Sequence, residues 1–486
     1  MANRPRTASI DSIHVLNDDS LLHVFYLYRP FVLGEDQDDD NTRIWGGKWL
    51  WEDERWWYNL THVCRRWRYV ILGSASYLRL SLLCTYSTPV ADMLAHSPPL
   101  PLVIDYSYDS QDFTAQDEEG SILALKKRDR VRRVRLYMPV IRLQKLILVM
   151  DEEYPILEYL IIRPQNKGNS LIFSETLQAT HLRHLMLTGF ALSIGSRLLT
   201  NAAGLVTLYL GMKHPSTYLY PDTLLRWISF MPQLETLAIV LDDVDSPDPN
   251  RVVERQLTQL THTPIMTPFT LPDLRYYRFE GGSTYLEAIV HQITAPRLER
   301  LQISFFHQLT FSVPRLLQFM NAGENIRFQS TKFKFSKGRV ALTVYPTREG
   351  EIYVLAMDIY CCNLDKQVSS VTQISNLLGQ MFAAVKHLTL EYSKHSRTSE
   401  ELNEVDRTEW HKLLRPFRNV KTLRVGDGLV HELSRCLQLE DGELLLDLLP
   451  ELQELTYFGS RNAGDAFTSF IDARQNAGCP VALVPS

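Results

Sequence analysis

The sequence lacks the features that mark membrane and secreted proteins. No apolar run in its 486 residues approaches the roughly 18 residues that a membrane-spanning helix needs. The opening stretch MANRPRTASIDSIHV has no hydrophobic core of a secretory signal, and acidic residues, which transit peptides avoid, soon follow its arginines. We therefore expect no membrane partner and a location in the cytosol or the nucleus.

Cysteine is scarce, and motifs of catalysis are missing. The six cysteines form no C-x-x-C pair, so neither a zinc site nor a disulfide scaffold is indicated. We find no G-x-x-x-x-G-K-[ST], H-E-x-x-H or G-x-S-x-G motif. The sequence thus predicts no catalytic residues, no metal and no cofactor. An unrecognised hydrolase on an α/β fold is the least favoured alternative.

Excess positive charge is also lacking, because the formal net charge is −5. This balance argues against nucleic acid as a partner. One local exception is KKRDRVRRVRL, from Lys126 to Leu136, which carries seven basic residues and one acid. A solvated face is the favoured interpretation of this run, and nucleic-acid contact is the alternative.

From about residue 150 a short phrase recurs: a break, then apolar-x-x-apolar-x-apolar. Successive anchors from Leu157 to Leu298 lie 23 to 40 residues apart. Each phrase ends with the alternation of a strand that has one buried face. Helix-like stretches separate the phrases. The phrases are YPILEYLII, THLRHLML, AGLVTLYL, MPQLETLAI, LPDLRYYRF, APRLERLQI, AVKHLTL, RNVKTLRV and LPELQELTY.

This order of helix, break and short strand resembles irregular leucine-rich repeats. We expect residues 126–486 to form an α/β solenoid with a curved, mostly parallel sheet, interrupted at 326–383 by a hairpin-like insertion or longer-stranded repeats. An ordinary α/β sheet without repeat symmetry is the alternative. The predicted buried row is Leu160, Leu185, Leu208, Leu237, Leu301, Leu388, Leu423 and Leu455.

The amino-terminal part, residues 10–80, has a helical pattern. Asn17 and Asp18 are good caps for a first helix, and an acidic loop (Gly34 to Asp40) and several tryptophans follow it. The stretch WWYNLTHVCRRWRYVI, Trp56 to Ile71, then has apolar residues at steps of three and four, which predicts one further helix. Residues 81–125 are rich in proline and acids, and we expect a linker there.

Two of these segments resemble the F-box family. LNDDSLLHVF, from Leu16 to Phe25, is similar to L-P-x-E-L-L-x-x-I-F, with Asn17 in place of the proline. WYNLTHVCRRWRYVI is similar to W-x-x-L-x-x-V-C-R-x-W-x-x-I. With the proline-rich stretch that follows, the chain resembles F-box proteins of mushroom-forming fungi. About twenty extra residues between the two halves depart from the family pattern.

The resemblance implies a substrate-recognition subunit of a Skp-cullin-F-box ubiquitin ligase. Such a subunit has no active site and raises the effective concentration of substrate near the ligase. The alternative is a repeat scaffold that joins no ligase and keeps its F-box as a cap. The expected adaptor-binding residues are Leu16, Leu21, Val24, Phe25, Val63, Cys64 and Trp67.

The substrate is expected on the exposed, concave side of the sheet. The residue between the last two apolar positions of each phrase points there. The first of these positions are apolar or aromatic and later ones polar or basic, which predicts a groove with a hydrophobic end and a basic end. The expected substrate-binding residues are Ile161, Met186, Tyr209, Arg278 and Arg424.

Overall fold

The structure is a computed structural model in which the chain divides into two compact units. Unit 1 comprises Met1–Asn166 and Phe173–Leu182, and unit 2 comprises Lys167–Ile172 and Arg183–Ser486. The structure describes residues 16–29, 55–107, 113–166, 170–193, 195–212, 217, 219–241, 267–306, 308, 310–322, 326–348, 352–361, 363–393, 405–438, 448–457 and 465–485. The acidic loop from Gly34 to Asp40 lies outside these residues.

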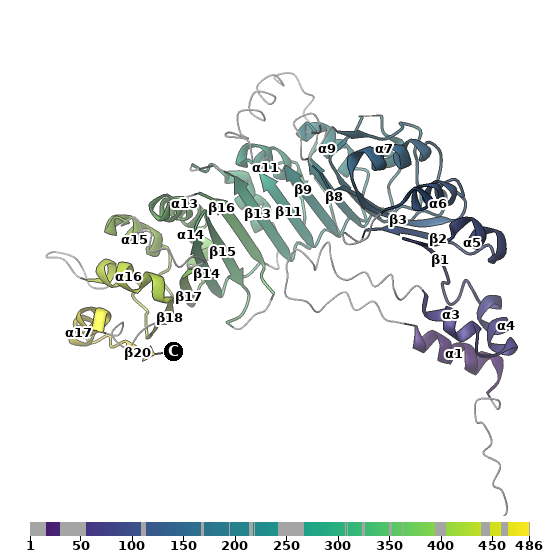
Figure 1. The fold of residues 1–486 in the computed structure, drawn as a ribbon. Helices are drawn as coiled ribbons and strands as arrows, with labels where there is room; N and C mark the ends of the chain where they lie inside the picture. Colours follow the sequence, from purple (N-terminus) through teal and green to yellow (C-terminus); the bar gives the residue numbers. More distant parts are fainter. Residues whose placement is uncertain are drawn as a thin grey trace, which may run out of the picture. The chain divides into compact units, whose positions relative to one another are not determined.

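Unit 1 combines short helices with a parallel sheet of four strands in the order β1-β2-β3-β4 (Figure 1). The strands are β1 (Leu82–Cys84), β2 (Leu102–Tyr106), β3 (Val131–Met138) and β4 (Tyr159–Pro164). The helices are α1 (Asp18–Tyr28), α3 (Trp56–Thr61), α4 (Arg65–Gly73), α5 (Val90–His96), α6 (Ala115–Leu125) and α7 (Val140–Val149).

The expected linker, residues 81–125, is largely ordered α/β structure instead. It contains β1, α5, β2 and α6, and β2 pairs directly with β3. The prolines that suggested a linker lie at element boundaries: Pro89 is the N-cap position of α5, and Pro101 directly precedes β2. Proline is tolerated at both places because no ladder or helix hydrogen bond from its nitrogen is needed.

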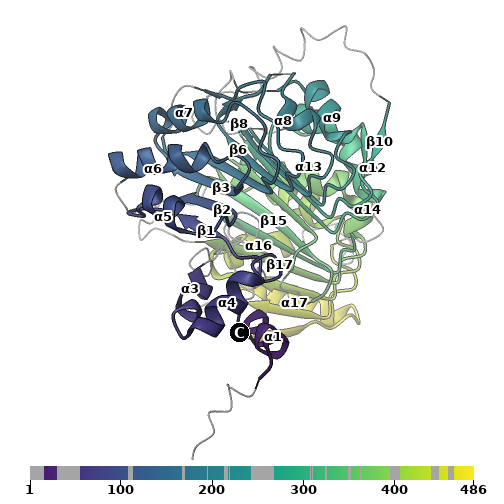
Figure 2. The same cartoon turned by 90° about the vertical axis from the view of Figure 1, so that its right-hand side faces the viewer.

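Unit 2 carries twelve strands that follow one another along a curved, mostly parallel sheet, with helices along its outer side (Figures 1 and 2). The strands, in chain order, are β6 (His184–Thr188), β8 (Thr207–Met212), β9 (Thr236–Leu241), β11 (Tyr276–Gly281), β13 (Arg300–Phe306), β14 (Ser330–Ser336), β15 (Arg339–Tyr345), β16 (Leu355–Tyr360), β17 (His387–Ser393), β18 (Thr422–Val425), β19 (Glu454–Tyr457) and β20 (Ala482–Pro485).

The helices of unit 2 lie between the strands along the chain, as the sequence predicted. Several pack against their neighbours in series, including α9 with α11 and α15 with α16. The helices are α8 (Arg197–Thr200), α9 (Pro221–Ile228), α11 (Ser283–Val290), α12 (Pro314–Asn321), α13 (Leu364–Leu377), α14 (Gly379–Phe382), α15 (Arg407–Leu414), α16 (Val430–Leu437) and α17 (Thr468–Asn476). Two small parallel pairs join β5 (Leu171–Ile172) to β7 (Phe190–Ala191) and β10 (Phe269–Thr270) to β12 (Ile293–Thr294).

The predicted leucine row is confirmed within unit 2. Leu185 is in register with Leu208 and Leu208 with Leu237. At the far end Leu388, Leu423 and Leu455 occupy successive register positions. All seven predicted leucines of unit 2 are 1% exposed or less. The eighth, Leu160, lies in unit 1, where it is in register with Val134.

The interruption at 326–383 is an antiparallel insertion in the parallel sheet. β15 pairs antiparallel with both β14 and β16, whereas β16 pairs parallel with β13 and β14 pairs parallel with β17. Gly338 makes the turn between β14 and β15 at φ 98°, a conformation that favours glycine. The buried row therefore continues through Leu355, Val344 and the polar but fully buried Thr331 to Leu388.

The buried row predicts a large difference between two neighbouring residues of β17. Leu388 is 1% exposed, so Leu388→Ala should lower the free energy of unfolding by about 2–5 kcal/mol because it leaves a cavity. Thr389 is half-buried on the opposite face, so Thr389→Ala should cost less than about 1 kcal/mol. Urea titration of the full chain measures both values; equal losses would contradict the assignment of the buried face.

Candidate functional site

The first candidate site is the pair of helical segments that carry the F-box-like motifs. Asn17 caps α1 as expected, because its side chain accepts a hydrogen bond from the backbone nitrogen of Ser20 at 2.8 Å. Asp18 and Asp19 follow in the first turn, where the helix dipole favours negative charge. Leu21 and Phe25, both 1% exposed, form the buried side of α1.

The second motif forms two helices, so the prediction of one helix from Trp56 to Ile71 is wrong. The chain leaves α3 after Thr61 and begins α4 at Arg65. Cys64 between them is extended, and its sulfur accepts a hydrogen bond from the backbone nitrogen of Trp67 at 3.4 Å. The spacing of apolar residues continues through the break, and cysteine is not a common helix cap. The sequence pattern therefore gave no sign of the break between α3 and α4.

Side-chain contacts join α1 to α4. The rings of Phe25 and Trp67 meet edge to face, with centroids 5.0 Å apart. Arg66 forms an ion pair with Asp18 at 2.8 Å and also donates to the backbone oxygen of Leu16. The aromatic contact and the buried leucines supply most of the stabilisation, because exposed ion pairs contribute about 1 kcal/mol or less.

The seven expected adaptor-binding residues divide by exposure. Leu21 and Phe25 are buried, so they belong to the core of the helical segments. Leu16, Cys64 and Trp67 are half-buried. Val24 and Val63 are 48% and 58% exposed and are the members of the set most available to a partner.

Further exposed apolar side chains, which the sequence did not single out, lie on the same helical segments as these two valines or in the turn after α4. Leu27 and Tyr28 are 58% and 63% exposed and share one side of α1 with Val24, at helical spacings of three and four. Tyr69 on α4 is 78% exposed. Seven of the fifteen large exposed apolar side chains among the described residues lie here. They are Val24, Tyr26, Leu27, Tyr28, Val63, Tyr69 and Tyr77, and we call them the apolar cluster.

The second candidate site is the row of residues expected to bind substrate. Met186, Tyr209, Ala238 and Arg278 occupy neighbouring register positions on β6, β8, β9 and β11. Arg424 belongs to the same row on β18, in register with Thr389. Ile161 lies in unit 1 on β4, in register with Arg135.

This row is less exposed than the sequence predicted. Met186 and Arg278 are each only 9% exposed, and Ala238 is fully buried. Tyr209 is half-buried, and Arg424 is exposed. Large side chains on adjacent strands cover one another, because the strands are only about 4.8 Å apart. The alternation of residues along one strand predicts which face a side chain lies on, but not how far its neighbours on other strands cover it.

An acidic neighbour compensates the charge of Arg278, so the predicted basic end is not basic there. Arg278 forms an ion pair with Glu280 on the same face of β11, and its Nε donates to the same carboxylate at 2.8 Å. Lys332 likewise pairs with Glu391 at 2.8 Å. This part of the face has a mixed, largely paired set of charges.

A polar cluster lies beside Arg278. The hydroxyl of Tyr276 donates to Oε1 of Gln302 at 2.6 Å, and that of Tyr353 lies 3.4 Å from the same oxygen. The guanidinium of Arg300 lies over the Tyr276 ring at 5.3 Å. Burial raises the pKa of Tyr276, so the hydroxyl stays protonated and keeps its role as a donor.

The described residues offer little reactive chemistry. Among them, no three His, Cys, Asp or Glu side chains gather as metal ligands. Burial raises the pKa of the Cys84 thiol to about 12, so it is protonated at neutral pH and a poor nucleophile. No helix in the part of the chain that the structure describes is long and apolar enough to span a bilayer.

Comparison with known proteins adds no family assignment. The chain matches no protein-family model and no curated protein.

The cap at Cys64 predicts that two similar substitutions differ in their effect on α4. Cys64→Ser keeps an acceptor for the Trp67 nitrogen and should preserve α4, because serine is a favoured cap. Cys64→Ala removes the acceptor and should destabilise the helix by about 1 kcal/mol. Hydrogen exchange of the α4 peptide, read by mass spectrometry, should be about fivefold faster in the alanine variant alone. Equal exchange in both variants would contradict the cap.

Proposed function

We propose that the chain is the substrate-recognition subunit of a Skp-cullin-F-box type ubiquitin ligase. In this proposal the helical segments of residues 10–80 bind the Skp-type adaptor, and the strands of the carboxyl-terminal part, interpreted as irregular leucine-rich repeats, bind a protein substrate. The chain itself performs no chemistry and acts by bringing substrate and ligase together.

The observation that carries the proposal is the apolar cluster. Solvated helices seldom expose several large apolar side chains together, and such groups mark interaction surfaces. Val24 and Val63 belong both to this cluster and to the residues that the F-box resemblance assigns to adaptor binding. The agreement between motif and exposure supports a protein partner at this position.

The regular strands support the second half of the proposal. A buried leucine of the row lies on eight of the twelve strands of unit 2, as expected of repeats that share one continuous core. Regular leucine-rich repeats carry an asparagine or cysteine after the strand phrase, whereas this sequence has residues such as Gln165, Phe190 and Lys213 there, which agrees with an irregular form of the repeat. A scaffold with the same repeats but without a ligase is the alternative, and adaptor binding separates the two.

The first functional prediction concerns the adaptor. Val24→Asp combined with Val63→Asp should weaken binding of a purified Skp adaptor to the full chain by more than about thirtyfold, because two exposed anchors of the interface become charged. The matched control is Ile141→Asp with Leu148→Asp, two α7 residues that are 77% and 67% exposed. Biolayer interferometry measures the affinities.

Three results are informative for this experiment. Loss in the valine variant with normal binding in the control supports the proposal. Equal loss in both variants contradicts the assigned surface. If the unaltered chain does not bind the adaptor, the ligase proposal is wrong and the scaffold interpretation replaces it.

The second functional prediction concerns the row on β6 and β8. Met186→Asp combined with Tyr209→Asp should abolish substrate capture and leave adaptor affinity unchanged, because the adaptor is proposed to bind residues 10–80. Proximity labelling in the native cell, with the proteasome blocked, measures capture as the set of labelled proteins that accumulate. Thr343→Asp with Thr389→Asp, farther along the same row, is the control. Unchanged labelling by the folded Met186/Tyr209 variant would exclude this end of the groove.

A further inference from the structure

The residues that directly precede nine strands of unit 2 lie along one edge of its sheet. Backbone hydrogen bonds align them: the nitrogen of Glu299 donates to the oxygen of Arg275 at 2.8 Å, and the nitrogen of Lys421 donates to that of Lys386 at 2.8 Å. We call these positions the edge row. Its members are Arg183, Val206, Glu235, Arg275, Glu299, Gln329, Lys386, Lys421 and Gln453.

At β9, β11 and β13 the edge row places a base between two acids. Arg275 lies between Glu235 and Glu299, and its guanidinium forms an ion pair with the Glu299 carboxylate at 3.3 Å. Two residues earlier on the same two chain segments, Arg297 pairs with Asp273 at 2.8 Å. Opposite charges on neighbouring strands are stabilising and like charges destabilising, so this part of the edge is compensated.

At β17 and β18 the edge row instead places two lysines side by side. Lys386 and Lys421 are both exposed, and the neutral residues Gln329 and Gln453 flank them in the row. Within the described residues, no ion pair holds either lysine. This pair of like charges therefore lacks the compensation that Arg275 receives.

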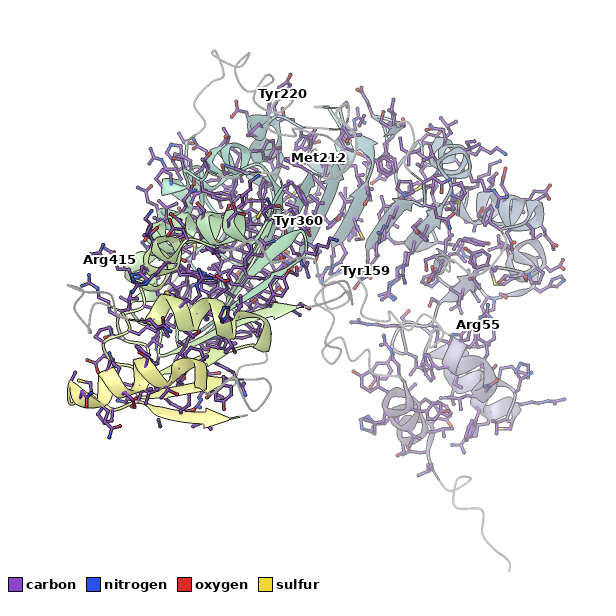
Figure 3. The ribbon with its side chains drawn as sticks, turned by 60° about the vertical axis from the view of Figure 1, so that its left-hand side comes forward. Arg55, Tyr159, Met212, Tyr220, Tyr360 and Arg415 are labelled. Atoms are coloured by element: carbon purple, nitrogen blue, oxygen red, sulfur yellow. The ribbon has the colours of Figure 1, made fainter. Side chains whose placement is uncertain are left out.

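Further cations follow the chain into this part of the edge. The stretch HKLLRPFRNVKTLR, residues 411–424, has a lysine or arginine at every third position from Lys412 and no acid. Lys412 pairs with Glu409, whereas Arg415 and Arg418 are exposed and have no ion pair in the part of the chain that the structure describes. Figure 3 labels Arg415, directly after α15. We call the four exposed cations the basic edge: Lys386, Arg415, Arg418 and Lys421.

Two acids of the described chain adjoin the basic edge on the side of β19. Glu451 is exposed and lies two residues before Gln453. Glu454 lies on the face of β19 opposite Leu455, where its carboxylate accepts a hydrogen bond from the hydroxyl of Thr456 at 3.1 Å. Neither acid forms an ion pair with a cation of the basic edge. Four cations against two acids leave net positive charge here.

The ring of His387, the first residue of β17, lies in the field of these cations. Its Nδ1 is 2.7 Å from the hydroxyl oxygen of Thr422. Burial lowers the pKa of His387, and the positive charges of Arg348 and Lys386 lower it further, against a smaller opposite effect of Glu454. The direction of this pKa shift agrees with the excess of cations counted along the edge.

We propose that the basic edge binds an acidic segment of a partner protein. A carboxylate beside Lys386 and Lys421 would supply the compensation that Glu299 gives to Arg275. The two strands are about 4.8 Å apart, so neighbouring carboxylates of one segment can contact both ammonium groups through charge-assisted hydrogen bonds. Four cations in a chain of net charge −5 suit a short acidic segment better than the long phosphate backbone of a nucleic acid. The proposed function is needed only to identify the bound segment as part of a substrate.

Fluorescence anisotropy of the full chain with a labelled peptide tests the basic edge. The probe is fluorescein-Ser-Glu-Glu-Glu-Glu-Ser, and the control peptide carries Gln at each Glu. Lys386→Glu with Lys421→Glu should weaken probe binding at least about tenfold, because two charge-assisted contacts are lost. The matched control is Arg183→Glu with Arg226→Glu, one exposed residue of the edge row and one of α9. This control should leave probe binding unchanged.

The single substitution Lys421→Glu separates binding from folding. It places an acid beside Lys386, as Glu299 lies beside Arg275, so the melting temperature should stay the same or rise. Probe binding should nevertheless fall at least about fivefold, because one contact is lost and a like charge faces the peptide. A lower melting temperature together with the loss of binding would assign Lys421 a structural role and overturn the site.

The remaining outcomes are equally direct. Equal loss in the two double variants, or equal binding of the Gln peptide, would contradict a site for acidic segments at this edge. Tighter binding of a twelve-nucleotide oligouridine, lost in the lysine double variant, would replace the peptide with RNA. A chain that binds the probe but not the Skp adaptor would keep the basic edge while the ligase proposal fails.

Discussion

The burial of one row of mostly apolar side chains, aligned from strand to strand, is the constraint on which the rest of unit 2 depends. Parallel pairing aligns Leu208 with Leu237 and Leu388 with Leu423, so these strands present their leucines to the helices at the same level. A slip of one residue would turn each leucine to the solvent side and bury its polar neighbour. The antiparallel insertion keeps this row intact, which explains how longer strands join the sheet without dividing the core.

The same alternation determines what remains for binding. Because the leucines face the helices, the intervening residues lie on the opposite face of each strand, and their character differs between the units. In unit 2 acids pair with basic side chains of this face at two places, Glu280 with Arg278 and Glu391 with Lys332. In unit 1 arginines stack on tyrosines across β3 and β4. The helices that precede the sheets add a third kind of surface, which is apolar and centres on Val24 and Val63.

Local patterns predicted much of this structure because local physics determines it. The phrase L-x-L identified the buried row, and Asn17 was recognised as the cap of α1. The break at Cys64 was missed because its apolar periodicity continues and only a weak sulfur acceptor marks it. Strands β1 and β2 were missed because proline and acidic neighbours concealed short buried segments. The neutralisation of Arg278 depends on Glu280, a neighbour on the same face of β11 that lies just after the repeated phrase.

The most direct test of the proposed function is hydrogen–deuterium exchange of the full chain with and without a purified Skp adaptor. The account predicts slower exchange in peptides that cover α1 and residues 62–73, because partner binding suppresses local opening of these short helices. Peptides of α6 and α7, which also expose apolar side chains, should be unchanged. Protection of α6 and α7 in place of α1 and α4, or no protection at saturating adaptor, would contradict the central claim.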